Sequence, residues 1–147
     1  MSKKVYVDIR NVRNEEMRQL WQQIIDDGVD PFAPEHLHKY HKKPILKTTE
    51  YWIVTENQHP YAGKKNHFLF ITRKYYEHFS ELPPEAKLDL FSLVESVCQE
   101  YNIVGGGFVM RFGDTSKSGG TVKHLHAQLI EPEEGCSVPA WFGSEAK

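Results

Sequence analysis

The stretch that decides the fold is residues 119–130, GGTVKHLHAQLI, which begins with two glycines and in which polar and apolar side chains alternate from His124 to Leu129. Alternation with a period of two is typical of a β-strand, so His124, His126 and Gln128 are expected on one face of a sheet. Successive polar side chains on such a face lie about 6.6 Å apart. The residues between them are apolar, so two imidazoles and an amide are predicted to form a row on a sheet with an apolar back.

A glycine-rich turn precedes this row, with Ser118, Gly119, Gly120 and Thr121 in sequence. Such a turn can direct several backbone N–H groups at one anion, which would place an oxyanion cradle beside nitrogen nucleophiles. Two histidines at i and i+2 can equally be a polar, half-exposed strand face. They can also share a metal ion, but zinc would need further ligands, and glutamine is a poor one. The residues alone leave these interpretations open.

The rest of the chain alternates between helical and strand-like patterns. Residues 14–27 carry apolar side chains at helical spacing, and Gly28 is a plausible end. The Pro- and His-rich residues 29–44 are expected to form a loop. Three further segments, 45–56, 67–72 and 107–112, are predicted to be strand-like. A second helix is predicted at 84–101. The order of helix, strands, helix, strands predicts an α+β fold with a mostly antiparallel sheet.

This ordered set of segments resembles the histidine triad (HIT) superfamily of nucleotidyl hydrolases and transferases. The family signature is His-x-His-x-His, and Gln replaces the third His in transferase- and phosphorylase-like branches, as in HLHAQ here. The resemblance extends over roughly residues 44–132 and includes ILKTTEYWIVTENQHPYAGKKNHF, NHFLFITRKYYEHFSELPPEAKLDLF and GGGFVMRFGDTSKSGGTVKHLHAQL. It implies one HIT-like domain over residues 1–147, with a five-stranded sheet and two main helices. The Pro- and acid-containing composition from Glu131 onward predicts an irregular tail, with Trp141 and Phe142 as anchors.

The resemblance also implies a role for each residue of the motif. His126 would attack the α-phosphorus of a nucleotide and form a nucleotidyl-histidine intermediate. His124 would support His126, whose tautomer the backbone around His124 would fix, and His67 would hydrogen-bond into the same network. The remaining roles concern the ligand: Asn57 would contact the ribose, and the phosphate oxygens would be held by Ser118, Gly119, Gly120 and Thr121. Gln128 can donate a hydrogen bond but cannot shuttle a proton, so transfer or phosphorolysis is favoured over hydrolysis.

The departures from the family bear on metals and on ligand contacts. Many members carry a zinc-binding Cys-x-x-Cys pair, where this chain has DPFAPE with Asp30 and Ala33, so neither a structural zinc nor a cofactor is expected. An Asn that many members have before the glycine turn is missing, which leaves Asp114 or Arg111 as its replacement. The loop histidines His36, His38 and His41 are interpreted as solvated rather than metal-binding, because no partner is spaced to complete a coordination shell. Two alternatives remain, a non-catalytic nucleotide-binding protein and a His-rich metal-binding module.

Composition restricts the partners and the compartment. The chain has 147 residues and a formal net charge of −2, which disfavours binding to duplex nucleic acid. It contains neither an apolar run of about 20 residues nor an N-terminal apolar segment typical of a secretory signal, so no membrane association is expected. Cys98 and Cys136 are isolated, which favours a reducing, cytoplasmic setting. The HIT resemblance implies a homodimer built on the second helix and the central strands.

Overall fold

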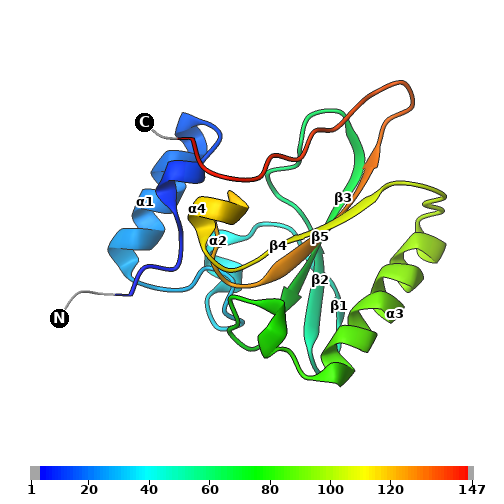
Figure 1. The fold of residues 1–147 in the computed structure, drawn as a ribbon, viewed down its shortest axis with the longest axis horizontal. Coiled ribbons are helices and arrows are strands. Elements are labelled where there is room, and N and C mark those ends of the chain that lie inside the picture. The colour runs from blue at the N-terminus through cyan, green and yellow to red at the C-terminus, as the bar shows by residue number, and fades with distance from the viewer. Residues whose placement is uncertain (1–3, 146–147) are drawn as a thin grey trace.

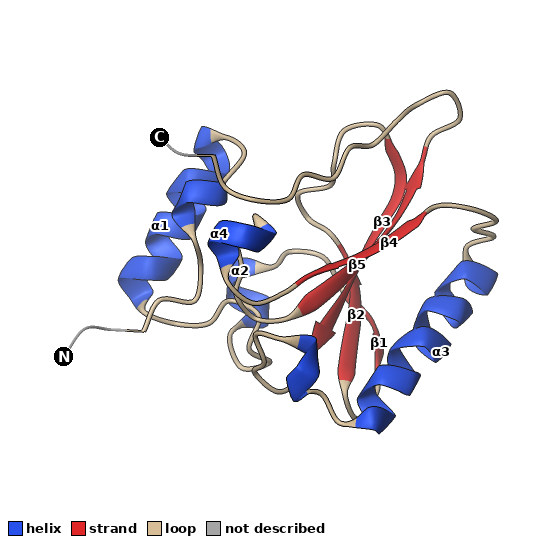
Figure 2. Cartoon of the chain, viewed as in Figure 1, coloured by secondary structure: helices blue, strands red, loops and turns tan. Residues whose placement is uncertain are grey.

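The computed structural model, which describes residues 4–145, has one five-stranded sheet with helices on both of its faces (Figures 1 and 2). Its strands are β1 (Ile45–Thr48), β2 (Trp52–Glu56), β3 (Lys64–Thr72), β4 (Gly107–Arg111) and β5 (His126–Pro132). The strand order is β1-β2-β3-β5-β4, and all neighbours are antiparallel. The predicted α+β class and five-stranded antiparallel sheet are therefore confirmed.

Two long helices lie on opposite sides of the sheet (Figure 1). Helix α1 (Glu15–Asp27) begins where the Asn14 side chain accepts a hydrogen bond from the Met17 N–H, and it ends at Gly28, whose φ is 68°. Helix α3 (Pro84–Glu100) begins with proline at its first position, where the missing N–H costs nothing. Both agree with the predicted helices at 14–27 and 84–101 to within one residue at each end.

Short helices interrupt two segments that were predicted as loops or connections. Helix α2 (Leu37–Tyr40) lies within the predicted loop 29–44, between the prolines rather than across them, and α4 (Thr115–Ser118) precedes the glycine turn. Two 3-10 turns, η1 (Ile9–Asn11) and η2 (Phe79–Glu81), complete the helical elements. None of the helices within residues 4–145 has the length and apolarity that crossing a membrane requires.

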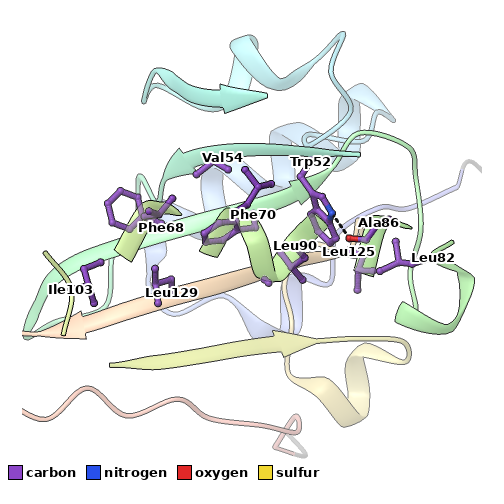
Figure 3. Close-up of a cluster of buried hydrophobic side chains, with 13 residues drawn as sticks. Trp52, Val54, Phe68, Phe70, Leu82, Ala86, Leu90, Ile103, Leu125 and Leu129 are labelled. Carbon is purple, nitrogen blue, oxygen red and sulfur yellow. Dashed lines mark hydrogen bonds between the residues drawn. The ribbon is translucent and has the colours of Figure 1, made fainter. Parts of the chain in front are cut away.

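Each face of the sheet packs against its own apolar layer. On the α3 side, Trp52, Phe68, Phe70, Leu125 and Leu129 pack against the helix (Figure 3). The Trp52 Nε1–H donates to the Ala86 carbonyl oxygen at 2.8 Å and so ties β2 to the first turn of α3. On the other face, alternate residues of β2 and β3 pack against α1, and the main side chains of this layer are Ile53, Leu69, Ile71, Met17, Trp21 and Ile24. The site described below lies on this α1 face.

The structure corrects two predictions for the last third of the chain. Strand β5 begins at His126 rather than at His124, because the preceding N–H groups of Lys123 and Leu125 donate to Tyr6 and Tyr76 instead of joining the ladder. The prediction that Trp141 and Phe142 anchor the tail is also wrong, since these residues are 77% and 61% exposed.

The tail is instead held mainly through its backbone and small residues. The Ser144 N–H donates to the carbonyl of Ser116, and its hydroxyl bonds to Asn11. The C-terminal segment, red in Figure 1, therefore returns across the molecule to lie beside α4. A Cβ at Gly119 would lie only 2.7 Å from the Gly143 carbonyl oxygen, which shows how closely the tail covers the glycine turn.

Candidate active site

A cavity of about 350 Å³ opens on the α1 face of the sheet and collects residues that are distant in sequence. His126 and Gln128 reach it from β5, and Arg111 reaches it from β4. The loop between β2 and β3 contributes Asn57 and Tyr61. Alternation along β5 explains the first pair, because residues two apart on a strand share a face.

His126 is held in one tautomer and one orientation. Its Nδ1 lies 2.8 Å from the backbone carbonyl oxygen of His124, and because a carbonyl only accepts, Nδ1 carries the proton. Burial lowers the pKa of His126 to about 4, against an opposing contribution from the bond to His124, so the ring is neutral at pH 7. The ring of Phe32 packs edge-on against it, with centroids 5.0 Å apart. The in-plane lone pair of His126 is therefore on Nε2, which is the ring nitrogen able to act as a nucleophile.

His124 does not join the row that the sequence predicts, because its ring turns into the protein interior. It is completely buried, and its Nδ1 lies 2.6 Å from Oδ2 of Asp30, while its Nε2 lies 2.6 Å from the carbonyl oxygen of Thr72. The cavity is lined by His126 and Gln128 but not by His124. Its observed contacts fit a supporting position, since its own carbonyl oxygen fixes the tautomer of His126.

His67 and Gln128 form a second network with defined proton positions. The Tyr61 backbone N–H donates to Nδ1 of His67 at 3.2 Å, so the proton of the neutral ring is on Nε2 and is donated to Oε1 of Gln128 at 2.6 Å. The Gln128 amide then donates from Nε2 to the Tyr61 hydroxyl at 3.3 Å. Burial lowers the pKa of His67 to about 4, with the Gln128 bond acting in the opposite direction. Asn57 lies beside this network, its Nδ2 3.2 Å from Nε2 of His67.

The glycine turn lies at the cavity, but part of its hydrogen-bonding capacity is already used. Gly119, Gly120 and Thr121 line the cavity. The Gly119 N–H donates to the Thr115 carbonyl at 3.0 Å, and the Gly120 N–H donates to the Ser118 hydroxyl at 3.1 Å. Ser118 therefore stabilises the turn, and phosphate binding by these residues stays a prediction.

Comparison with known proteins identifies the family. The HIT domain family model matches residues 39–135. The chain belongs to the HIT domain family. A search of curated proteins gives no significant match.

Solved HIT proteins share the fold of this HIT domain. A HIT family hydrolase from Clostridium thermocellum aligns with 69% of this chain and 89% of its own, at 19% identity and a TM-score of 0.55. A histidine triad nucleotide-binding protein from Candida albicans aligns over 85% and 82% of the two chains, at 15% identity and a TM-score of 0.56. The diadenosine triphosphate hydrolase of Plasmodium falciparum aligns over 65% of each chain, at 24% identity and a TM-score of 0.53.

Arg111 and Asp114 are the two candidates to replace the Asn that many family members have before the glycine turn, and only one of them lines the cavity. Arg111 lines it directly, as the register partner of His126 on the neighbouring strand. Asp114 instead caps α4, where its side chain accepts hydrogen bonds from the N–H and hydroxyl of Ser116.

The solvated-loop interpretation is wrong for His41. This side chain is 6% exposed, and its Nε2 bonds to the Thr55 hydroxyl at 2.8 Å, which itself donates to the Pro44 carbonyl. Burial lowers the pKa of His41 to about 4. Across residues 4–145 of the HIT domain, no group of three or more His, Cys, Asp or Glu side chains is arranged to hold a metal ion.

Among the cavity-lining residues that sequence reasoning missed are Arg13, Trp21 and Tyr61. Arg13 and Tyr61 lie in irregular segments, where no periodicity marks a functional side chain. Trp21 belongs to the apolar stripe of α1, and its pattern indicates only a core residue. A signal was present for Tyr61 alone, because it lies six residues before His67 in the turn that the resemblance covers.

Proposed function

We propose that this HIT-domain protein transfers or hydrolyses nucleotidyl groups, and that it acts on nucleoside phosphoanhydrides, including dinucleoside polyphosphates, through a covalent intermediate on His126. The observation that carries the proposal is the fixed, neutral His126, whose Nε2 lone pair belongs to a ring that lines the cavity. A neutral nitrogen with its second nitrogen already hydrogen-bonded is suited to nucleophilic attack on phosphorus.

The covalent step requires no proton donor. Nε2 forms a bond to the α-phosphorus while the bond from phosphorus to the leaving-group oxygen breaks, and that oxygen keeps the electron pair. The Nδ1 proton stays in place, and the positive charge that develops on the ring is stabilised by the carbonyl oxygen of His124 at 2.8 Å. In the second step an acceptor attacks the same phosphorus and returns the lone pair to Nε2.

Gln128 supports assignment to the HxHxQ branch, in which transfer to an acceptor is favoured over hydrolysis. An amide neither gains nor loses a proton near neutral pH, so it cannot deprotonate a water molecule. Both ends of the Gln128 amide are engaged, by His67 and by Tyr61. We assign Gly119, Gly120 and Thr121 to the transferred phosphate. We assign the ribose to Asn57, which lines the same cavity.

The experiment is a panel of nucleoside polyphosphates, dinucleoside polyphosphates and nucleotide sugars, with and without inorganic phosphate, analysed by product chromatography and intact mass. The parent protein should gain the mass of one nucleotidyl group, and His126→Ala should gain none. His38→Ala is the matched control, because His38 is exposed on α2. Equal turnover by the parent and His126→Ala would refute the nucleophile assignment. Nucleotide binding with neither turnover nor adduct would favour the non-catalytic alternative.

A second copy of the chain is the partner we propose, docked on the outer face of α3. The expected contribution of the central strands is replaced by the edge strand β4, because both edges of each central strand are already paired within the sheet. Within residues 4–145, β4 ends the sheet and pairs only with β5, so its outer edge can extend the sheet of a partner. Four apolar side chains are exposed on or near these elements, namely Leu88, Phe91, Val104 and Phe108. Sedimentation should give a dimer for the parent and for Val5→Glu, and a monomer for Phe91→Glu. A monomeric parent protein would contradict this proposal.

A further inference from the structure

We propose that Arg13, Tyr61 and Arg111 form a subsite for the leaving group, which selects substrates whose leaving group departs as a phosphate or polyphosphate anion. This inference rests on the proposed function and specifies the half of the substrate that is released. It concerns residues outside the HxHxQ strand, drawn from three separate parts of the chain.

The phenol ring of Tyr61 brings the two guanidinium groups together. The Arg13 guanidinium carbon lies 4.6 Å from the centre of the Tyr61 ring, a cation–π distance. Arg111 donates from Nη1 to the Tyr61 hydroxyl at 2.9 Å. The Trp141 carbonyl oxygen holds Arg111 from the other side, accepting from Nε at 3.1 Å and from Nη2 at 2.7 Å.

The positive charge of this cluster is not neutralised by the protein. Over the part of the chain that the structure describes, neither Arg13 nor Arg111 forms an ion pair, and no Asp or Glu lines the cavity. Partial burial lowers the pKa of Arg13, and repulsion from Arg111 acts in the same direction. Two like charges around one phenol are unfavourable in the free protein, and a multiply charged anion between them would relieve that repulsion.

The cluster also lies next to the reacting atoms. Arg111 is directly opposite His126 in the β4–β5 register, and such cross-strand partners have Cβ atoms about 5 Å apart. The Tyr61 hydroxyl accepts from Arg111 and from Gln128, so its own proton is directed to a third group. A phosphate oxygen in the cavity is a suitable acceptor for that proton and for the guanidinium N–H groups.

The chemistry of the leaving group decides what such a subsite achieves. When the bond between phosphorus and oxygen breaks, a phosphate leaving group takes the electron pair and gains a negative charge. Guanidinium groups stabilise charge as it develops, because they are placed before the reaction begins. A leaving group with one delocalised charge, such as a nitrophenolate, gains much less stabilisation from these guanidinium groups. The subsite therefore discriminates between leaving groups without contacting the transferred nucleotide.

The kinetic test compares two substrates that share one nucleoside 5′-monophosphoryl group. One carries a polyphosphate leaving group and the other a p-nitrophenyl leaving group. Arg13→Gln and Tyr61→Phe should each lower kcat/KM for the polyphosphate substrate by about 10- to 100-fold, the range for one charge-assisted hydrogen bond. They should change kcat/KM for the nitrophenyl substrate by less than about threefold. Arg18→Gln, on the surface of α1, is the matched control and should change neither.

An equal loss on both substrates would overturn the subsite and leave the proposed function intact. Failure of the parent to form an adduct with either substrate would refute the proposed function instead. The subsite is then tested by binding alone, with calorimetry of nucleoside mono- and diphosphates of all four ribonucleosides on His126→Ala. The diphosphate should bind at least about tenfold tighter, and adding Arg13→Gln should abolish this preference. No preference for the diphosphate would overturn the inference.

Discussion

The buried contact between Asp30 and His124 predicts a large and specific effect of one substitution, Asp30→Ala. Both side chains are almost inaccessible, at 8% and 1% exposure, and Oδ2 lies 2.6 Å from Nδ1. Oδ1 of Asp30 also accepts from the backbone N–H of Phe32 at 3.1 Å. Asp30→Ala removes both bonds and leaves two buried polar groups without their partner.

The size of the effect follows from these two bonds. A hydrogen bond to a charged partner contributes about 1.5–3 kcal/mol and an ordinary one about 1 kcal/mol, so their joint loss gives about 2.5–4 kcal/mol. In a domain of this size 1 kcal/mol shifts Tm by about 3 °C, so Asp30→Ala should lower Tm by about 10 °C.

The substitution should also slow adduct formation, because His124 holds His126 through its carbonyl oxygen at 2.8 Å. Small displacements of a reacting group cost one to two orders of magnitude in rate, so we expect at least about a tenfold loss. Asp30→Asn separates charge from shape. Its amide can donate to a neutral His124 and still accept from the Phe32 N–H, so it should recover at least about 1 kcal/mol of the loss.

The assay is urea unfolding of the single and double variants, with single-turnover kinetics on each. In a double-mutant cycle, Asp30→Ala and His124→Ala should couple by at least about 1.5 kcal/mol. Glu100→Gln is the control, because Glu100 pairs with Lys47 on the surface and should contribute less than about 1 kcal/mol. Additive single effects, or a loss no larger than that of Glu100→Gln, would refute the reasoning.

Three further predictions concern pH and the covered glycine turn. His41 and His67 have pKa values of about 4 in the folded protein, below the ordinary 6.5, so their contribution is complete above pH 6.5 and falls as the pH drops toward 4. Each should cost on the order of 2 kcal/mol of unfolding free energy at pH 5. His126, whose pKa is also about 4, adds a similar dependence, so His41→Asn should remove about a third of the total. With this pKa of about 4 the His126 ring remains neutral, so the rate of adduct formation should stay constant from pH 7 to pH 5. A rate that falls as the pH drops through 6.5 would contradict this. Gly119→Ala should destabilise by about 1–3 kcal/mol in thermal unfolding, because φ is +76° and the new Cβ would meet Gly143, whereas Gly120→Ala meets nothing closer than 3.4 Å and should be milder.

Local pattern predicts this sheet well because its central strands are short runs of β-branched, aromatic and other apolar residues bounded by turns. The mostly antiparallel sheet and the two long helices follow from local pattern and from end residues such as Asn14, Gly28 and Pro84, while the number of five strands follows from the HIT resemblance. The same reasoning fails at His124, whose ring direction depends on Asp30, 94 positions away. Alternation describes a residue's place on a strand, but a buried partner outside the strand decides whether that residue faces the cavity.

The part of the cavity that could be predicted comes from strand alternation, from the glycine turn at Gly119 and Gly120, and from the resemblance at Asn57. His126 and Gln128 follow from strand alternation, while Arg13 and Tyr61 come from segments with no repeating pattern. His41 shows the same limit, since a histidine beside two lysines has the composition of a solvated loop. It is buried because the hydroxyl of Thr55 offers it a hydrogen-bond acceptor at 2.8 Å. Contacts of this kind are tertiary, and single-sequence reasoning has no access to them.

The residue at position 128 links the two parts of the site, and an amide performs this link differently from an imidazole. Gln128 accepts from His67 and donates to Tyr61 at the same time, and its protonation does not change with pH. A neutral imidazole can also accept once and donate once, but on protonation it loses its acceptor and the bond to His67. An amide therefore keeps the strand that carries the nucleophile connected to Tyr61 and Arg111 across the whole pH range in which the fold is stable. A histidine at this position would gain a transferable proton, and its connection to His67 would depend on pH.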